Sequence, residues 1–152
     1  MMKRLVGILF VLAAILLTVD ASPAGRGQEY PFAPGQKIVI DLKMGGSVTI
    51  TGGDKSVALV SITTGGGQDA TEALAIRPIG GGLEISSDKT TEEEKWNNLK
   101  VSLQVPRMCD VQFNSMGGGL KLVDLRGTFN GKTMGGALTL EKVQGQVKLT
   151  TM

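Results

Sequence analysis

The side chains best placed to do chemistry are two carboxylates, Asp124 and Glu141, which an internal repeat sets diagonally on neighbouring strands. Paired strands lie about 4.8 Å apart, so these carboxylates could approach the roughly 5 to 9.5 Å separation that glycosidases use. The same register places Lys142 directly over Asp124, where a cross-strand ion pair is the simpler use of the charges. The pattern therefore favours a structural ion pair over a carbohydrate-active enzyme.

The composition excludes most other catalytic chemistry. The 152-residue chain contains no histidine and one cysteine, Cys109. It therefore has no Ser-His-Asp or Cys-His nucleophile system, no histidine metal site and no imidazole base. A single thiol cannot form an internal disulfide or a multi-cysteine metal site, and the nearby Val111 and Phe113 favour a buried structural role. We expect no catalytic residue, no cofactor, no cofactor-binding residue and no metal site.

Groups suited to binding are also sparse. Aromatic residues make up 4% of the chain and the net charge is +2. Such a small charge gives no electrostatic footprint for nucleic acid or anionic lipid, and we expect no nucleic-acid partner. Trp96, Tyr30 and Phe32 could stack on sugars, but their scarcity favours a role as plugs of the strand layer or of the N-terminal end of the solenoid.

The N-terminal residues 1–21 have the layout of a secretory signal peptide. Lys3 and Arg4 precede the apolar run Leu5–Val19, and the small residues Ala21-Ser22-Pro23-Ala24 follow. A helix of this run spans about 22 Å, short of the roughly 30 Å hydrocarbon core. We expect cleavage after Ala21, export to the periplasm, cell surface or medium, and no membrane span afterwards. An uncleaved anchor is the alternative, and the lack of a following cysteine disfavours a lipoprotein.

A recurring glycine string must position most of the remaining side chains. Each copy is a glycine turn followed by a short alternating strand that sends two apolar side chains to one face. The copies are Met44-Gly45-Gly46-Ser47-Val48-Thr49-Ile50, Ile79-Gly80-Gly81-Gly82-Leu83-Glu84-Ile85, Met116-Gly117-Gly118-Gly119-Leu120-Lys121-Leu122 and Met134-Gly135-Gly136-Ala137-Leu138-Thr139-Leu140.

Two of these copies belong to a longer repeat, because residues 115–132 align without a gap on residues 133–150. A fixed short period whose apolar phases persist predicts a β-solenoid, in which each coil stacks on the previous one. From Asn114 onward we therefore predict a β-solenoid with an 18-residue coil, and a plain sandwich is the alternative. The stacked, inward-pointing pairs would be Leu120 over Leu138, Leu122 over Leu140, Leu125 over Val143 and Phe129 over Val147.

Upstream of the repeat, apolar residues alternate along longer strands. The runs Ile38–Leu42 and Leu99–Val105 alternate strictly, and Pro106 ends the second because proline cannot donate to a ladder. The polar stretch Ser86–Asn98 reads as a solvated connector, with one helical turn begun by a capping box at Thr91–Glu94. The fold class predicted is all-β, with a short N-terminal β-strand layer leading into a parallel β-helix-like solenoid.

The order of these motifs resembles the bacterial DUF4097 family, whose name describes adhesins of β-helical form. Its likeness rests on the Gly-Gly-x-Val-x-Ile unit, the Leu-x-Val-Pro at Leu103–Pro106, the Val111–Ser115 strand and the Ser/Thr-Met-Gly-Gly-x-Leu-x-Leu coils. The resemblance covers about residues 32–152 and implies an exported, repetitive β protein of the cell envelope. No catalytic or binding residues come with it.

The predicted organisation is therefore a signal peptide (1–21), a linker (22–31) and one DUF4097-like domain (32–152). Thr151-Met152 matches the start of a further coil, so we expect the domain to be truncated at its C-terminal end. An open-ended assembler is the alternative.

Three function classes fit these observations. The favoured one is an exported, non-catalytic envelope module, an adhesin or a structural or binding scaffold, whose partner is a cell-surface polymer or envelope protein. Small polar residues such as Thr139, Thr150 and Thr151 suit a flat contact face. The alternatives are an envelope-stress or signalling accessory that binds a membrane partner, and the carbohydrate-active enzyme.

Overall fold

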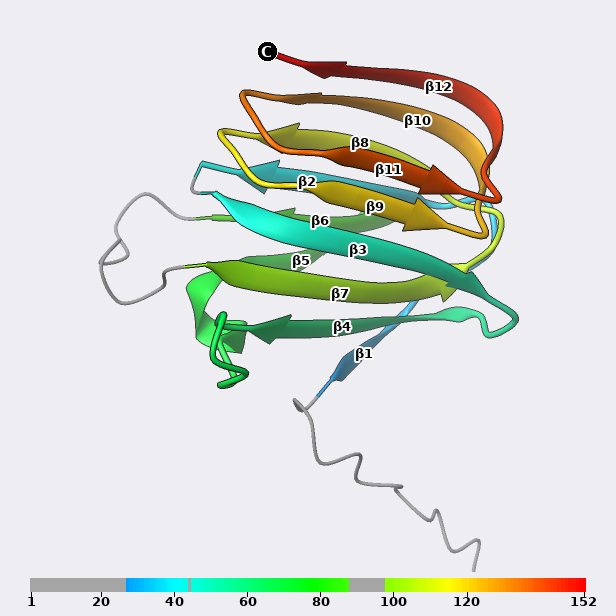
Figure 1. The fold of residues 1–152 in the computed structure, drawn as a ribbon. Helices are drawn as coiled ribbons and strands as arrows, with labels where there is room; N and C mark the ends of the chain where they lie inside the picture. Colours follow the sequence, from blue (N-terminus) through cyan, green and yellow to red (C-terminus); the bar gives the residue numbers. More distant parts are fainter. Residues whose placement is uncertain (1–26, 44, 88–97) are drawn as a thin grey trace, which may run out of the picture.

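The computed structural model describes residues 27–43, 45–87 and 98–152 (Figure 1). They form twelve strands and one short 3-10 turn, η1 (Thr71–Ala73). No helix within these ranges is long and apolar enough to cross a membrane. The predicted signal peptide and the helical turn at Thr91–Glu94 lie outside the described residues.

The strands make two six-stranded sheets whose inner faces enclose one core (Figure 1). Sheet A has, in order, β1 (Gln28–Pro31), β4 (Val57–Thr63), β7 (Leu99–Pro106), β3 (Gly46–Gly53), β9 (Leu120–Val123) and β11 (Leu138–Glu141). Sheet B has β12 (Gln144–Thr151), β10 (Arg126–Thr133), β8 (Asp110–Ser115), β2 (Lys37–Leu42), β6 (Gly82–Ser86) and β5 (Ala75–Ile79). The all-β prediction is confirmed.

Alternation along each strand decides which side chains form the core. In β2, for example, Ile38, Ile40 and Leu42 are buried and the residues between them face outward. Successive side chains of a strand point to opposite faces, so one face of each sheet packs inward and the other meets solvent. Burying one large aliphatic side chain contributes about 1.5 to 3 kcal/mol, which makes this pattern the main driving force for the sandwich.

The C-terminal strands β8 to β12 alternate between the sheets, so each return to the same sheet completes one coil. Parallel pairing of β9 with β11 and of β10 with β12 has the 18-residue offset predicted from the repeat. The predicted pairs found opposite each other are Leu120–Leu138, Leu122–Leu140 and Phe129–Val147. This part of the register prediction is confirmed.

A buried hydroxyl closes each coil corner and explains the Ser/Thr-Met-Gly-Gly motif. The Thr133 hydroxyl donates to the Gly135 carbonyl oxygen at 2.6 Å, and the Ser115 hydroxyl donates equivalently to Gly117 at 2.5 Å. Beyond the corner, Gly118 has a φ of +92°, and a Cβ there would lie 1.9 Å from the Gly46 carbonyl oxygen. Glycine is therefore required for both the turn and the close stacking of the coils.

Two features of the predicted architecture are corrected. The structure does not show a solenoid, because the two sheets are open and mix parallel with antiparallel pairs. The N-terminal strands also form no separate layer, since β2 pairs with β8 and β3 pairs with β9 in the middle of the sheets. The glycine string at residues 44–50 explains this, because it gives β3 the same phase as β9. Residues 28–31, predicted to lie in a linker, form β1 and pair with β4.

The inward orientation predicted for the second coil is only partly realised. Leu138 and Val143 are partly buried against the core, whereas Leu140 and Val147 are 43% and 42% exposed. Their partners one coil earlier, such as Leu122, are fully buried. The difference arises because, among the described residues, the β11–β12 coil has a neighbouring coil on one side only.

Candidate functional site

The two carboxylates considered for catalysis are engaged by different cations. Asp124 Oδ2 accepts a hydrogen bond from Arg107 Nε at 2.9 Å, and Glu141 Oε1 lies 3.2 Å from Lys121 Nζ. The expected ion pair of Asp124 with Lys142 is therefore wrong. Asp124 and Lys142 both occupy left-handed turn positions, with φ values of 54° and 52°, and Asp124 takes its cation from a neighbouring turn instead.

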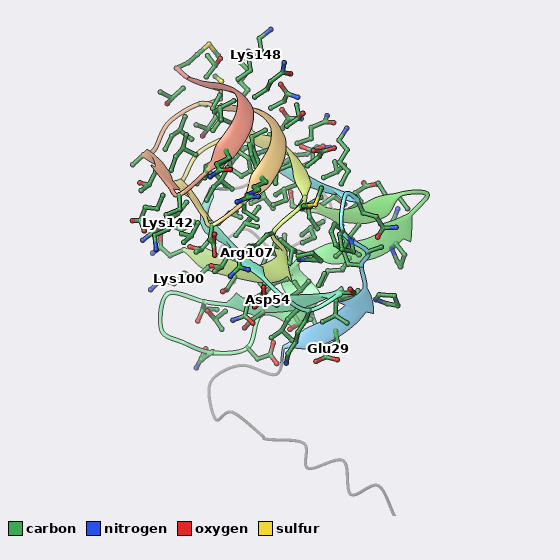
Figure 2. All side chains as sticks on the ribbon, turned by 90° about the vertical axis from the view of Figure 1, so that its right-hand side faces the viewer. Glu29, Asp54, Lys100, Arg107, Lys142 and Lys148 are labelled. Atoms are coloured by element: carbon green, nitrogen blue, oxygen red, sulfur yellow. The ribbon has the colours of Figure 1, made fainter. Side chains whose placement is uncertain are left out.

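Arg107 joins three turns at one corner of the molecule. Its guanidinium also pairs with Asp54 of the β3–β4 turn, which lies close by in Figure 2. The hydrogen bond to Asp124, with the charges of Asp124 and Asp54, raises the pKa of Arg107 above its ordinary value. The guanidinium stays charged and holds the β3–β4, β7–β8 and β9–β10 turns together, which is a structural use of all three side chains.

Cys109 has the environment of an unreactive thiol. Its side chain is 1% exposed, and Sγ donates to the Asp110 carbonyl oxygen at 3.3 Å. Burial, and secondly the Asp110 charge, raise the pKa of the Cys109 thiol from 9.0 to about 12. The thiolate is the reactive form, so this environment suppresses nucleophilic and redox chemistry, as the structural interpretation of Cys109 predicted.

The aromatic residues considered for sugar stacking differ in placement. Phe32 is 1% exposed and belongs to the core, which agrees with a plug of the strand layers. Tyr30 is partly buried against the same core and its hydroxyl donates to Gln28 Oε1 at 2.5 Å. Trp96 lies outside the described residues. Within the described ranges, no three Cys, Asp or Glu side chains gather as a potential metal site.

The outer face of sheet B carries a polar surface that the sequence interpretation did not single out. Strand pairing aligns its side chains in two rows, Gln112–Asn130–Lys148 and Asn114–Lys132–Thr150, across β8, β10 and β12. A shallow hollow of about 290 Å³ lies over these strands, lined by Gln112, Asn114, Asn130, Gly131, Lys148 and Thr150. The signal was present in the sequence, because residues of one row are 18 positions apart.

We call this hollow and its lining side chains the amide hollow. Thr139, on sheet A, is exposed like Thr150 and Thr151, but it lies on the other sheet and does not line the hollow. Amide side chains both donate and accept hydrogen bonds, and a lysine adds a cation with three donors. The arrangement can therefore bind a polar, hydrogen-bonding ligand, and its lining contains no carboxylate, thiol or imidazole.

A larger depression opens at the opposite end of the molecule. It has a volume of about 840 Å³ and is bordered by residues of β1, η1, β5 and the loop before η1. It adjoins Gly27, the first residue described, so the described residues do not define its full wall.

Comparisons with known proteins give no family for this chain. No model of a known family matches it, and no curated protein matches it. The DUF4097 resemblance therefore stays a prediction.

Several solved structures are similar to the chain at low identity. A "putative adhesin" from Bacteroides fragilis has 17% identity and a TM-score of 0.46, with coverage of 81% of this chain and 59% of that chain. A "putative cell adhesion protein" from Clostridium sporogenes has 7% identity and a TM-score of 0.37, with coverage of 84% and 98%. A "putative lipid binding protein" from Parabacteroides distasonis has 14% identity and a TM-score of 0.35, with coverage of 78% and 61%. This chain thus spans less than two thirds of the Bacteroides fragilis protein, and similarity this low assigns no function to it.

Proposed function

We propose that the protein is an exported, non-catalytic module of the bacterial cell envelope that binds an envelope component through a flat sheet face. The chain carries the layout of a signal peptide, which supports export. Its C-terminal strands pair in parallel at an 18-residue offset, and this repeat presents side chains in aligned rows. The role is that of an adhesin or binding scaffold.

The observation that carries this proposal is the amide hollow on in-register parallel strands. Backbone pairing fixes the side chains of neighbouring strands about 4.8 Å apart, so a surface of this kind needs little ordering when it meets a polymer. The candidate catalytic carboxylates, by contrast, are not available for binding or catalysis in the same way, because each forms an ion pair with its own cation.

Export and cleavage are tested by mass spectrometry of the protein recovered from the host envelope and medium. The expected product begins near Ser22. Recovery of intact Met1 in the envelope fraction would support a retained anchor instead.

The binding role is tested by incubating purified protein with isolated envelope material and measuring the bound fraction. We expect binding that follows the folded fraction of the protein and is unchanged in Asp124→Asn. Folded Asp124→Asn protein that lost a glycan-cleaving activity of the parent would overturn the scaffold proposal in favour of an enzyme.

A further inference from the structure

One lining residue of the amide hollow, Gly131, is a glycine at an inward position of β10. Gly131 occupies the phase that Phe113 fills in β8 and Leu149 fills in β12. A Cβ on Gly131 would lie 2.7 Å from the Phe113 carbonyl oxygen and 3.0 Å from Leu149 Cδ2. The backbone of β10 therefore packs against its neighbours with no room for a side chain at this position.

The polar groups around the hollow form a two-dimensional grid. Asn130 stands directly between Gln112 and Lys148, while Asn114 and Thr150 flank the next outward position of β10. The grid offers amide donors, amide acceptors and a hydroxyl on a flat surface without large apolar side chains. This chemistry suits a ligand with closely spaced hydroxyl groups, such as a polysaccharide.

Charge selects among such ligands. Lys132 and Lys148 project from the outer face of β10 and β12, and neither has a carboxylate within 4.0 Å among the described residues. On sheet A, by contrast, Lys121 is neutralised by Glu141. Figure 2 shows Lys148 extending away from the β12 ribbon, with Lys100 of sheet A well separated from it. The β10 and β12 side of the grid therefore presents positive charge beside its amides, while Asp41 of β2 lies opposite Asn114 at the β8 side, and this distribution favours an anionic group near Lys148.

We propose that the amide hollow is a binding site for an acidic polysaccharide, whose hydroxyls contact Gln112, Asn114 and Asn130 and whose carboxylate contacts Lys148. This site rests on the proposed binding function and names its ligand class. The polymer lies across β8, β10 and β12, since the aligned rows run in that direction.

The test is calorimetric titration of the purified protein with polygalacturonate, a linear polymer of uronic acid, at low salt. Lys148→Gln removes the cation and Asn130→Ala removes the central amide, and both residues are exposed, so both variants should fold. We expect each to weaken binding about five- to tenfold, the scale of one net hydrogen bond. Lys100→Gln removes the same charge from the outer face of sheet A and should weaken binding by less than about twofold.

The remaining outcomes distinguish a wrong ligand class from a wrong proposed function. Equal losses of polygalacturonate affinity in Lys100→Gln and Lys148→Gln would overturn the site, because they would indicate non-specific electrostatic attraction to the whole surface. Binding to neutral dextran as strong as to polygalacturonate, or binding only to phosphatidylglycerol vesicles, would overturn the acidic polysaccharide. No binding to polygalacturonate by protein that still binds envelope material refutes this ligand class alone, whereas loss of both refutes the proposed function as well.

Discussion

The two ends of the sandwich are built from different kinds of strand. At the N-terminal end the outermost strands are β1 and β5. Each pairs antiparallel with its neighbour, β1 with β4 and β5 with β6. They are four and five residues long and contain Pro31 and Pro78. At the other end, the outermost strands are β11 and β12, which contain no proline. Each pairs parallel with its neighbour, β11 with β9 and β12 with β10. Figure 1 shows β12 as the outermost strand beside the C-terminus.

This difference shows how the position of a coil in the stack affects how much its side chains stabilise the fold. Proline lacks an N–H and, away from strand ends and bulges, is found in edge strands, so β1 and β5 are suited to end their sheets. The coils β8 to β12 instead repeat one pairing pattern, and each is stabilised by its neighbours. Identical side chains at the same position of successive coils should therefore add most to the free energy of unfolding where a coil is covered on both sides. Four predictions test or sharpen this comparison.

The largest expected effect compares two leucines at the same phase of neighbouring coils. Leu122 is fully buried between Ile50 and Leu140, whereas Leu140 is 43% exposed. Leu122→Ala should lower the free energy of unfolding by about 3 to 4 kcal/mol, because it leaves a cavity that cannot collapse. Leu140→Ala should cost about 1 kcal/mol or less. Urea denaturation measures both, and equal losses would show that coil position does not matter.

The second prediction compares two glycines with similar dihedrals. Gly118, at a coil corner, and Gly81, in the β5–β6 hairpin, have φ values of 92° and 84°. A Cβ on Gly81 meets nothing within 4 Å, while one on Gly118 would clash with the Gly46 backbone. Gly118→Ala should therefore cost about 2 to 3 kcal/mol and Gly81→Ala about 1 kcal/mol, measured as shifts of the thermal midpoint. A milder effect at Gly118 would mean that the coils can separate locally.

The third prediction uses Cys109, in the covered middle of the stack, as a reporter of pH. Its pKa is raised in the folded protein from 9.0 to about 12, so the unfolded chain loses its thiol proton first. The stabilising contribution is full below pH 9 and is lost as pH rises toward 12. At about pH 10, wild-type protein should lose about 1 kcal/mol of stability relative to its own value at neutral pH. Cys109→Ala should lack this component, and parallel pH profiles of the two proteins would contradict it.

The smallest effect is expected at the corner outside the core. Asp124→Asn should change the free energy of unfolding by about 0.5 kcal/mol or less, as is usual for surface substitutions. Asparagine tolerates the left-handed turn, and Arg107 keeps its pairing with Asp54. Urea denaturation beside Leu140→Ala measures the difference. A larger loss at Asp124 than at Leu140 would show that the corner, not the end coil, stabilises this part of the molecule.

The candidate site shows where sequence interpretation reached its limit. The 18-residue spacing already aligned Asn130 with Gln112 and Lys148, so the rows could have been read from the repeat. The hollow could not, because its shape depends on how three paired strands lie in the folded protein. The role of Arg107 was also inaccessible, because it brings together turns that are far apart in the sequence.

The sequence by itself determined the all-β class, the core-facing side of the alternating strands upstream of the repeat and the offset between the last coils. These properties depend on residues close in the chain or on an exact repeat, and alternation of apolar residues expresses them directly. Only the tertiary structure decided the partners of the strands upstream of the repeat. The glycine string at 44–50 leads into β3, which pairs with β9, whereas the similar string at 79–85 forms the β5–β6 hairpin of the other sheet. Local sequence cannot distinguish these outcomes, because the choice depends on which distant strand buries the shared apolar face.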